Sequence, residues 1–272
     1  MDENIPYLLL TPGPLTTSKS VKEVMLQDYC TWDNDYHAIV QEIRQRLVDL
    51  VSGSSDYTTV LMQGSGTFTV EATLGTAIGP HDKVLVASNG AYGQRMAQIV
   101  QRLGIAHSLL QVPETTPISG RDIEQRLQAD ASISHIAMVH CETTTGLLNP
   151  AEQIGQLARR YQKTYILDAM SSLGGVPIQV DNVGAHYLVS SSNKCIQGVP
   201  GFGFVIAHRP TFERTAGWAR SLSLDLYDQW REMEQAGGKW RFTSPTHVVR
   251  AFLQALHELD QEGGVACRYA RY

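Results

Sequence analysis

Short apolar runs alternate with longer amphipathic stretches along most of the chain. Five short runs predict strands, at residues 57–62, 83–88, 135–140, 165–170 and 186–191. Stretches of helical periodicity lie between them, at 69–78, 92–105, 121–129 and 151–162. Alternation of strands and helices at this spacing predicts crossover connections. We therefore expect an α/β fold with a mostly parallel sheet and helices on both faces.

Two further segments extend this pattern toward the C-terminus. The run 201–210 is expected to add another strand. The stretch 246–262 predicts a long amphipathic helix, and Gly263 and Gly264 follow it directly. Glycines commonly follow the last turn of a helix, so we expect the helix to end there.

Composition narrows the class of protein. Hydrophobic residues make up 43% of the chain and charged residues 18%, which is enough apolar material for a sizeable core. The net charge of −5 disfavours nucleic acid as a partner. None of the four cysteines forms a CxxC pair, which fits a reducing cytoplasm and predicts no metal site. The apolar run near the N-terminus is too short for a signal peptide or a membrane span.

Candidate chemistry is expected just after the strands, because open parallel sheets bind ligands beyond the carboxyl ends of their strands. Ser65, Gly66 and Thr67 follow the first strand and precede a helix, an arrangement that can bind an anion or simply form a capped turn. Tyr92 begins the helix after the second strand. Its ring could pack in the core or stack on a ligand.

Three more positions follow later strands. Thr143 lies in a hydroxyl-rich loop that could either cap the chain or bind a ligand. Asp168 closes an apolar run and is followed by small uncharged residues, which favours a positively charged ligand atom as its partner. Lys194 follows the fifth strand, and a partly desolvated lysine there could serve as an amine nucleophile. A solvated loop lysine is the ordinary alternative.

Taken together, these positions supply an anion site, a flat ring, hydroxyl donors, a carboxylate and a lysine. Pyridoxal phosphate needs that set of groups, including a lysine for a Schiff base and an acid for its ring nitrogen. A dinucleotide-binding domain is the competing interpretation. It is disfavoured because no GxGxxG motif follows the first strand.

Seven segments along essentially the whole chain extend this interpretation to a family. They are LLLTPGPLTTS, QGSGTFTVEA, SNGAYGQR, HCETTTG, LDAMSSLGG, SSNKCIQGVPGFGFV and KWRFTSPTH. With them the chain resembles the class V, fold-type I pyridoxal-phosphate aminotransferases. The resemblance implies the large domain of that fold, with a mostly parallel seven-stranded sheet. It divides the chain into an N-terminal segment at 1–15, the cofactor-binding large domain at 16–264, and the start of a truncated C-terminal small domain at 265–272.

The resemblance also implies a role for individual residues. Lys194 would hold the cofactor through a Schiff base, and Asp168 would pair with the pyridine nitrogen. Thr243 of a neighbouring subunit would reach the cofactor phosphate, which implies a homodimer. The remaining residues implied to bind the cofactor are Ser65, Gly66 and Thr67 at the phosphate, Tyr92 stacked on the ring, Thr143 near the phenolic oxygen, Met170 and Asn193 in the pocket, and Trp240 near Thr243.

The implied reaction is transamination of 2-aminoethylphosphonate with pyruvate, giving phosphonoacetaldehyde and L-alanine in the degradation of phosphonates. Another class V reaction, such as alanine–glyoxylate transamination, is the alternative. Family members usually continue into a small domain with an arginine that grips the substrate anion. Arg268 and Arg271 match no such motif. A cofactor-binding remnant with little activity is therefore a third expectation.

Overall fold

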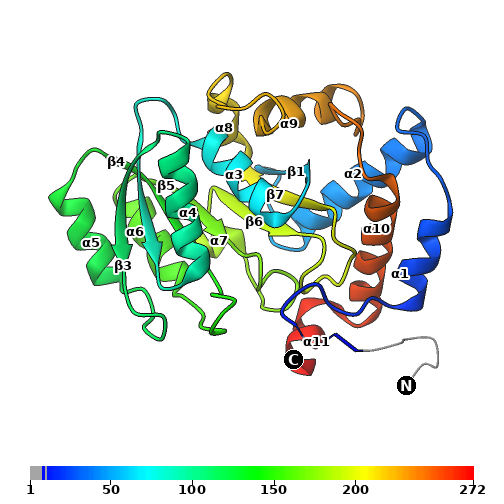
Figure 1. The fold of residues 1–272 in the computed structure, drawn as a ribbon, viewed down its shortest axis with the longest axis horizontal. Coiled ribbons are helices and arrows are strands. Elements are labelled where there is room, and N and C mark those ends of the chain that lie inside the picture. Colours follow the sequence, from blue (N-terminus) through cyan, green and yellow to red (C-terminus); the bar gives the residue numbers. More distant parts are fainter. Residues whose placement is uncertain (1–7, 10) are drawn as a thin grey trace.

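A seven-stranded sheet runs through the molecule and positions the site (Figure 1). The computed structural model describes residues 8, 9 and 11–272, so the predicted N-terminal segment lies partly outside the described residues. The strands are β1 (Tyr57–Gln63), β2 (Lys83–Ser88), β3 (Ala106–Gln111), β4 (Ile133–Val139), β5 (Thr164–Asp168), β6 (Tyr187–Ser191) and β7 (Phe202–His208).

The strands are arranged in the order β1-β7-β6-β5-β4-β2-β3. Strand β7 pairs antiparallel with both of its neighbours, and every other pairing is parallel. The prediction of a mostly parallel seven-stranded sheet is therefore confirmed. Strand β3, at one edge, had no counterpart among the individually predicted strands.

Eleven helices occur in the described residues. They are α1 (Lys19–Glu23), α2 (Asn34–Asp49), α3 (Gly66–Ala77), α4 (Ala91–Arg102), α5 (Gly120–Ala129), α6 (Ala151–Arg160), α7 (Val180–Val183), α8 (Arg209–Phe212), α9 (Leu226–Gln235), α10 (Thr246–Gln261) and α11 (Gly264–Arg271), with short 3₁₀ turns at Val24–Leu26 and Glu213–Thr215. Five of the helices, α3 to α7, connect consecutive strands.

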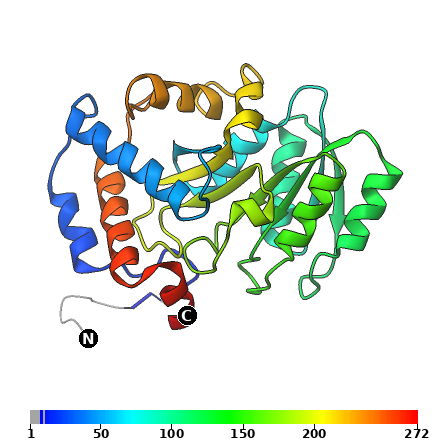
Figure 2. The same cartoon turned by 180° about the vertical axis from the view of Figure 1, so that it is seen from behind.

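Helices lie on both faces of the sheet, as predicted. Helices α3 and α4 cover the face that is toward the viewer in Figure 1, and α2 and α6 cover the face seen in Figure 2. The central strands β4 and β6 are almost wholly buried between these layers. Because both faces of these strands are buried, their sequences are continuous apolar runs and do not alternate between apolar and polar residues. The sheet is thus a rigid support whose strand ends carry the polar residues.

The C-terminal helices fold back along the sheet domain. Helix α10, which matches the predicted amphipathic helix, packs against α2. Helix α11 follows it, and the guanidinium of its buried Arg268 donates a hydrogen bond of 2.8 Å to the carbonyl oxygen of Cys195. The C-terminal residues therefore contact the loop that begins at Lys194. The division into domains stays a prediction.

None of the helices in the described part of the chain combines the length and the apolar character needed to cross a lipid bilayer.

Candidate active site

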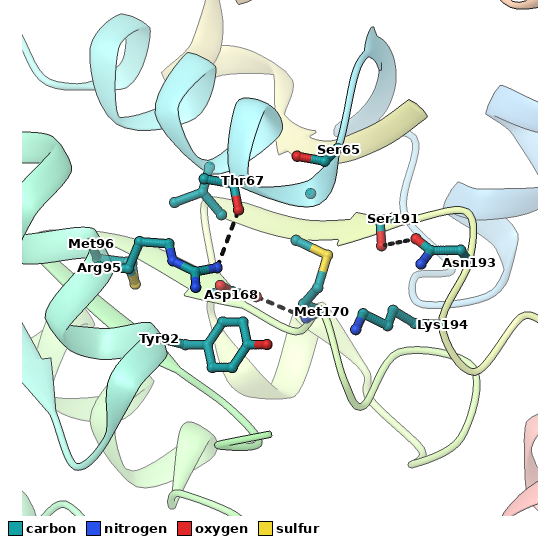
Figure 3. A pocket seen from close by; sticks show the side chains of 12 residues that line it. Ser65, Thr67, Tyr92, Arg95, Met96, Asp168, Met170, Ser191, Asn193 and Lys194 are labelled. Carbon is teal, nitrogen blue, oxygen red and sulfur yellow. Dashed lines mark hydrogen bonds between the residues drawn. The ribbon is translucent and has the colours of Figure 1, made fainter. Parts of the chain in front are cut away.

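A cavity of about 180 Å³ opens at the carboxyl ends of the parallel strands (Figure 3). It lies between the N-terminal ends of α3 and α4 and the loops that follow β5 and β6. Its lining residues are Ser65, Gly66, Thr67, Val70, Tyr92, Arg95, Met96, Asp168, Met170, Ser191, Asn193 and Lys194. This is the edge of the sheet where sequence reasoning placed the chemistry.

The first wall is the N-terminus of α3. Gly64 turns the chain after β1 with a positive φ of 108°, and Ser65 then precedes the helix without capping it through its side chain. The first backbone N–H groups of a helix have no partner within the helix, and the helix dipole favours an anion beside them. The hydroxyls of Ser65 and Thr67 line the same cavity. This wall can therefore bind a phosphate group.

Gly66 has a steric role at this wall. A Cβ atom at Gly66 would lie 2.5 Å from both the Sδ and the Cε atoms of Met170. The absence of a side chain lets the Met170 side chain lie across the helix terminus. A larger residue at position 66 would push Met170 further into the cavity.

Asp168 ends β5 and is only 4% exposed. Its Oδ1 atom accepts a hydrogen bond of 2.8 Å from the backbone N–H of Met170. Burial is the main cause that raises the pKa of Asp168 to about 6, and the negative charge of Glu142 adds to it, while the Met170 N–H and the charges of Lys194 and Arg95 partly oppose it. The surroundings of Asp168 therefore stabilise its ionised form only in part. A cationic ligand atom in the cavity would stabilise its charged form.

Lys194 lies across the cavity from Asp168, with Met170 between them in Figure 3. Burial lowers the pKa of the Lys194 amine, and the neighbouring negative groups only partly oppose this effect. A lowered pKa increases the fraction of neutral amine, which is the nucleophilic form. Gly13 packs against the Lys194 side chain, and a Cβ atom at position 13 would overlap Lys194 Cδ. The N-terminal segment therefore restricts the lysine.

Helix α4 contributes the aromatic wall through Tyr92. The guanidinium of Arg95 lies over the Tyr92 ring, with its carbon 4.7 Å from the ring centroid. Sequence reasoning assigned no role to Arg95. Arg95 lies three residues after Tyr92 in a predicted helix, and residues at i and i+3 share a helix face. This spacing could have indicated that Arg95 faces the same cavity as Tyr92.

Glu142 is a second functional candidate that the sequence reasoning missed. It is fully buried beneath the N-terminus of α4, and its carboxylate accepts from the backbone N–H of Tyr92 at 3.3 Å. Gly90 makes room for it, since a Cβ atom there would overlap the Glu142 side chain. A helix N-terminus stabilises a carboxylate, which accounts for this burial. A charged residue three positions after the end of a buried strand was the available signal.

The predicted site residues do not all line this cavity. Those that do are Ser65, Gly66, Thr67, Tyr92, Asp168, Met170, Asn193 and Lys194. Thr143 lies just behind it, with its hydroxyl 2.6 Å from that of Ser171 on the loop after β5. Trp240 and Thr243 lie elsewhere, in the connection between α9 and α10.

Trp240 lines a second cavity, of about 420 Å³, on the other side of the loop between β1 and α3. Its ring packs edge-on against Phe202, with the centroids 6.2 Å apart. Two aromatic side chains of this cavity are largely exposed, Phe68 at 54% and Phe242 at 49%. Thr243, next to Phe242, is also exposed. Within one subunit, Trp240 and Thr243 do not reach the cavity that holds Lys194.

Comparison with known proteins identifies relatives along nearly the whole chain. A family model described as aminotransferase class V matches residues 25–266. The 2-aminoethylphosphonate–pyruvate transaminase of Syntrophobacter fumaroxidans is 62% identical over 268 residues, which cover 98% of this chain and 72% of that protein. The protein of the same name from Salmonella heidelberg is 60% identical over 267 residues, covering 98% of this chain and 73% of the relative.

Solved structures share the fold. Alanine–glyoxylate aminotransferase from Nostoc sp. superposes with a TM-score of 0.89 at 27% identity, covering 100% of this chain and 72% of that one. Pyridoxamine–pyruvate aminotransferase from Mesorhizobium loti superposes with a TM-score of 0.89 at 22% identity, covering 100% of this chain and 69% of that one.

Proposed function

The chain belongs to the class V aminotransferase family, and from this premise we propose that it transfers an amino group from 2-aminoethylphosphonate to pyruvate. The observation that carries the proposal is the pair formed by Lys194 and Asp168, a half-buried amine and a buried carboxylate that line the same cavity. Identity of 62% to a transaminase with that name supports this choice of substrates.

The residues of the cavity fit pyridoxal phosphate, the cofactor of this family. The α3 N-terminus with Ser65 and Thr67 suits its phosphate, and Tyr92 offers a ring face for stacking. The pKa of Asp168 is raised because burial outweighs the stabilising effects of the Met170 N–H and of the Lys194 and Arg95 charges. A protonated ring nitrogen would supply a further cation. Asn193 and Met170 would complete the walls, with Thr143 behind the loop after β5.

When bound, the cofactor supplies an electron sink for the electron pair released when the carbon that bears the amino group loses its proton. Asp168 would hold the positive charge that makes this sink effective. Tyr92 of α4 and Met170 of the loop after β5 line the cavity and would restrict the orientation of the ring. Fixing these groups before the reaction lowers the barrier by pre-orienting the reacting atoms.

Lys194 would act twice. Its neutral amine would hold the cofactor covalently in the absence of substrate, with loss of water as the bond forms. When substrate is bound, the same amine would be free to take the proton from the substrate carbon that bears nitrogen and to hold it for return. A half-buried amine of lowered pKa suits both steps, because it is neutral more often than an exposed lysine.

The site would be completed by a second subunit. Thr243 is exposed next to Phe242, which lines the second cavity together with Phe68, and these two side chains are 49% and 54% exposed. An apolar surface of this kind typically marks an interface. A homodimer through this surface would bury these side chains and bring Thr243 to the phosphate site of its partner. Sedimentation of the purified protein tests this, and a monomer at all concentrations would contradict it.

The activity is tested by measuring L-alanine formed from pyruvate in the presence of 2-aminoethylphosphonate and pyridoxal phosphate. We expect product with the natural chain and none with the Lys194→Ala variant. Repeating the assay with glyoxylate as acceptor and L-alanine as donor separates this reaction from alanine–glyoxylate transamination. A chain that binds the cofactor but forms no product from either pair would refute the proposed activity and leave a cofactor-binding remnant.

A further inference from the structure

The charge balance of the cavity leaves one cation without a role. Among the described residues that line it, the charged side chains are Arg95, Asp168 and Lys194. The proposed function uses the amine of Lys194 for a covalent bond and the carboxylate of Asp168 for the ring nitrogen. A phosphate monoester carries a charge of about −1.5 to −2 at neutral pH. Arg95 is therefore the side chain available to neutralise it.

Arg95 already lies beside the anion-binding end of α3. Its Nη1 atom donates a hydrogen bond of 3.2 Å to the Oγ1 atom of Thr67, in the first turn of that helix. The guanidinium thus lies next to the backbone N–H groups that face the cavity. A planar guanidinium can donate two parallel hydrogen bonds to phosphate oxygens, which a helix terminus alone cannot replace.

Arg95 contacts a neighbour on its own helix. Tyr92 and Arg95 are three residues apart on α4, and the guanidinium carbon lies 4.7 Å from the centroid of the tyrosine ring. The backbone of Tyr92 is in turn held by the buried carboxylate of Glu142. The Arg95 side chain is exposed, so it can turn toward an anion without breaking a buried contact.

We propose that Arg95 binds the phosphate group of the cofactor, and so completes the anion site begun by the N-terminus of α3. This inference rests on the cofactor site proposed above. The phosphonate of the substrate is a second tetrahedral oxyanion with the same chemistry. The hydrogen bond to Thr67 favours the cofactor phosphate, because Thr67 belongs to the helix terminus that would bind that group.

Equilibrium titration with two ligands tests the proposal. The affinity of the purified chain for pyridoxal phosphate and for pyridoxal, which lacks the phosphate, is measured by absorbance with natural protein, Arg95→Gln and Arg95→Lys. Arg102→Gln, an exposed arginine on the same helix but outside the cavity, is the matched control. Binding by the natural chain is established first, so that failure of the cofactor site itself is recognised separately.

We expect Arg95→Gln to weaken pyridoxal phosphate binding by about 10- to 100-fold and to leave pyridoxal binding unchanged. Arg95→Lys should fall between, and Arg102→Gln should match the natural protein. Equal weakening for both ligands would show that Arg95 acts through the Tyr92 ring and would overturn the proposal. No weakening for either ligand would also overturn it.

A last arm distinguishes the two oxyanions. The loaded protein is titrated with 2-aminoethylphosphonate, and the bleaching of the cofactor absorbance gives the concentration for half-saturation. An increase in that concentration with unchanged affinity for pyridoxal phosphate would assign Arg95 to the substrate phosphonate and overturn its assignment to the cofactor.

Discussion

At the scale of single residues, the site depends on groups that are held in unfavourable environments. Asp168 is a carboxylate with a pKa raised to about 6 from 3.8, and burial is the largest cause. A raised carboxyl pKa means that the folded state binds a proton more tightly than the unfolded state. The folded protein is therefore penalised when the pH rises through the interval between these two values.

This penalty predicts that Asp168→Asn stabilises the protein when no cofactor is added. The amide keeps the Oδ1 acceptor for the N–H of Met170 but carries no charge. We expect the free energy of unfolding at pH 8 to rise by about 3 kcal/mol, an order-of-magnitude figure that follows from the pKa shift. The gain should shrink as the pH falls below about 6 and vanish below about 4, because the wild-type carboxyl is then protonated in both states.

Urea unfolding of both proteins across this pH range is the measurement. A variant that is no more stable than the natural chain at pH 8 would show that Asp168 is not held in a costly ionised state.

Gly13 gives a second prediction at this scale. Its backbone lies against Lys194, so a methyl group at position 13 would overlap the lysine side chain. Gly13→Ala should displace the amine and slow the covalent capture of pyridoxal phosphate. It should also lower the free energy of unfolding, because Gly13 has a φ of 158° and a Cβ atom there would lie 2.9 Å from the backbone oxygen of Asn193. The rate of the absorbance change on mixing checks this, with Gly53→Ala as a control, since a Cβ atom there meets no neighbour within 4 Å. Equal capture rates for Gly13→Ala and the natural chain would contradict it.

Sequence reasoning found most of this cavity because each strand end is visible as the end of an apolar run. It assigned no role to Gly13 or Arg95. Gly13 reaches Lys194 only through folding across a large sequence separation, which no local pattern reveals. Arg95 resembled any solvated arginine of a surface helix until the position of Thr67 opposite it was known.

At the scale of elements, the sheet predicted from alternating strands and helices is the observed one, with one strand missed. Strand β3 forms one edge of the sheet and has mostly exposed or half-exposed residues. Strand β1 is also at an edge but is mostly buried, whereas β3 lacks the continuous burial and the apolar run by which the other strands were found. The antiparallel direction of β7 also has no local signal, since it depends on a connection that lacks a crossover helix.

The packing of α2 on the sheet gives a prediction at this scale. Arg44 of α2 is buried, and its Nε atom donates a hydrogen bond of 2.7 Å to the carbonyl of Thr59 in β1. The same guanidinium forms an ion pair with Glu234 of α9. Arg44→Ala would leave a strand carbonyl and a carboxylate without their partner, and should lower the free energy of unfolding by about 2–4 kcal/mol.

Denaturant unfolding measures this loss, with Arg46→Ala as the control. Arg46 lies on the same helix, and its ion pairs with Glu42 and Asp260 are partly exposed to solvent. That variant should lose less than about 1 kcal/mol. Equal losses for the two variants would show that burial of Arg44 contributes nothing.

At the scale of the whole molecule, the sheet is a rigid support, and the site is assembled from residues that follow the ends of its strands. The chain covers 72% of the S. fumaroxidans relative and 73% of the Salmonella one, including every residue assigned here to the cofactor. Family membership and fold follow from the sequence and the structure together. The substrate anion, in contrast, has no assigned partner among the described residues. The two cationic side chains that line the cavity, Arg95 and Lys194, are both assigned to the cofactor by the proposals above.

The central claim is that Lys194 forms a covalent bond with a pyridine aldehyde whose ring nitrogen is held by Asp168. Its most direct test is borohydride reduction of the chain mixed with pyridoxal phosphate, followed by peptide mass spectrometry. The account predicts a phosphopyridoxyl group on the peptide that carries Lys194, and its loss in Lys194→Ala. Modification spread over other lysines, with Lys194 unmodified, would contradict the account.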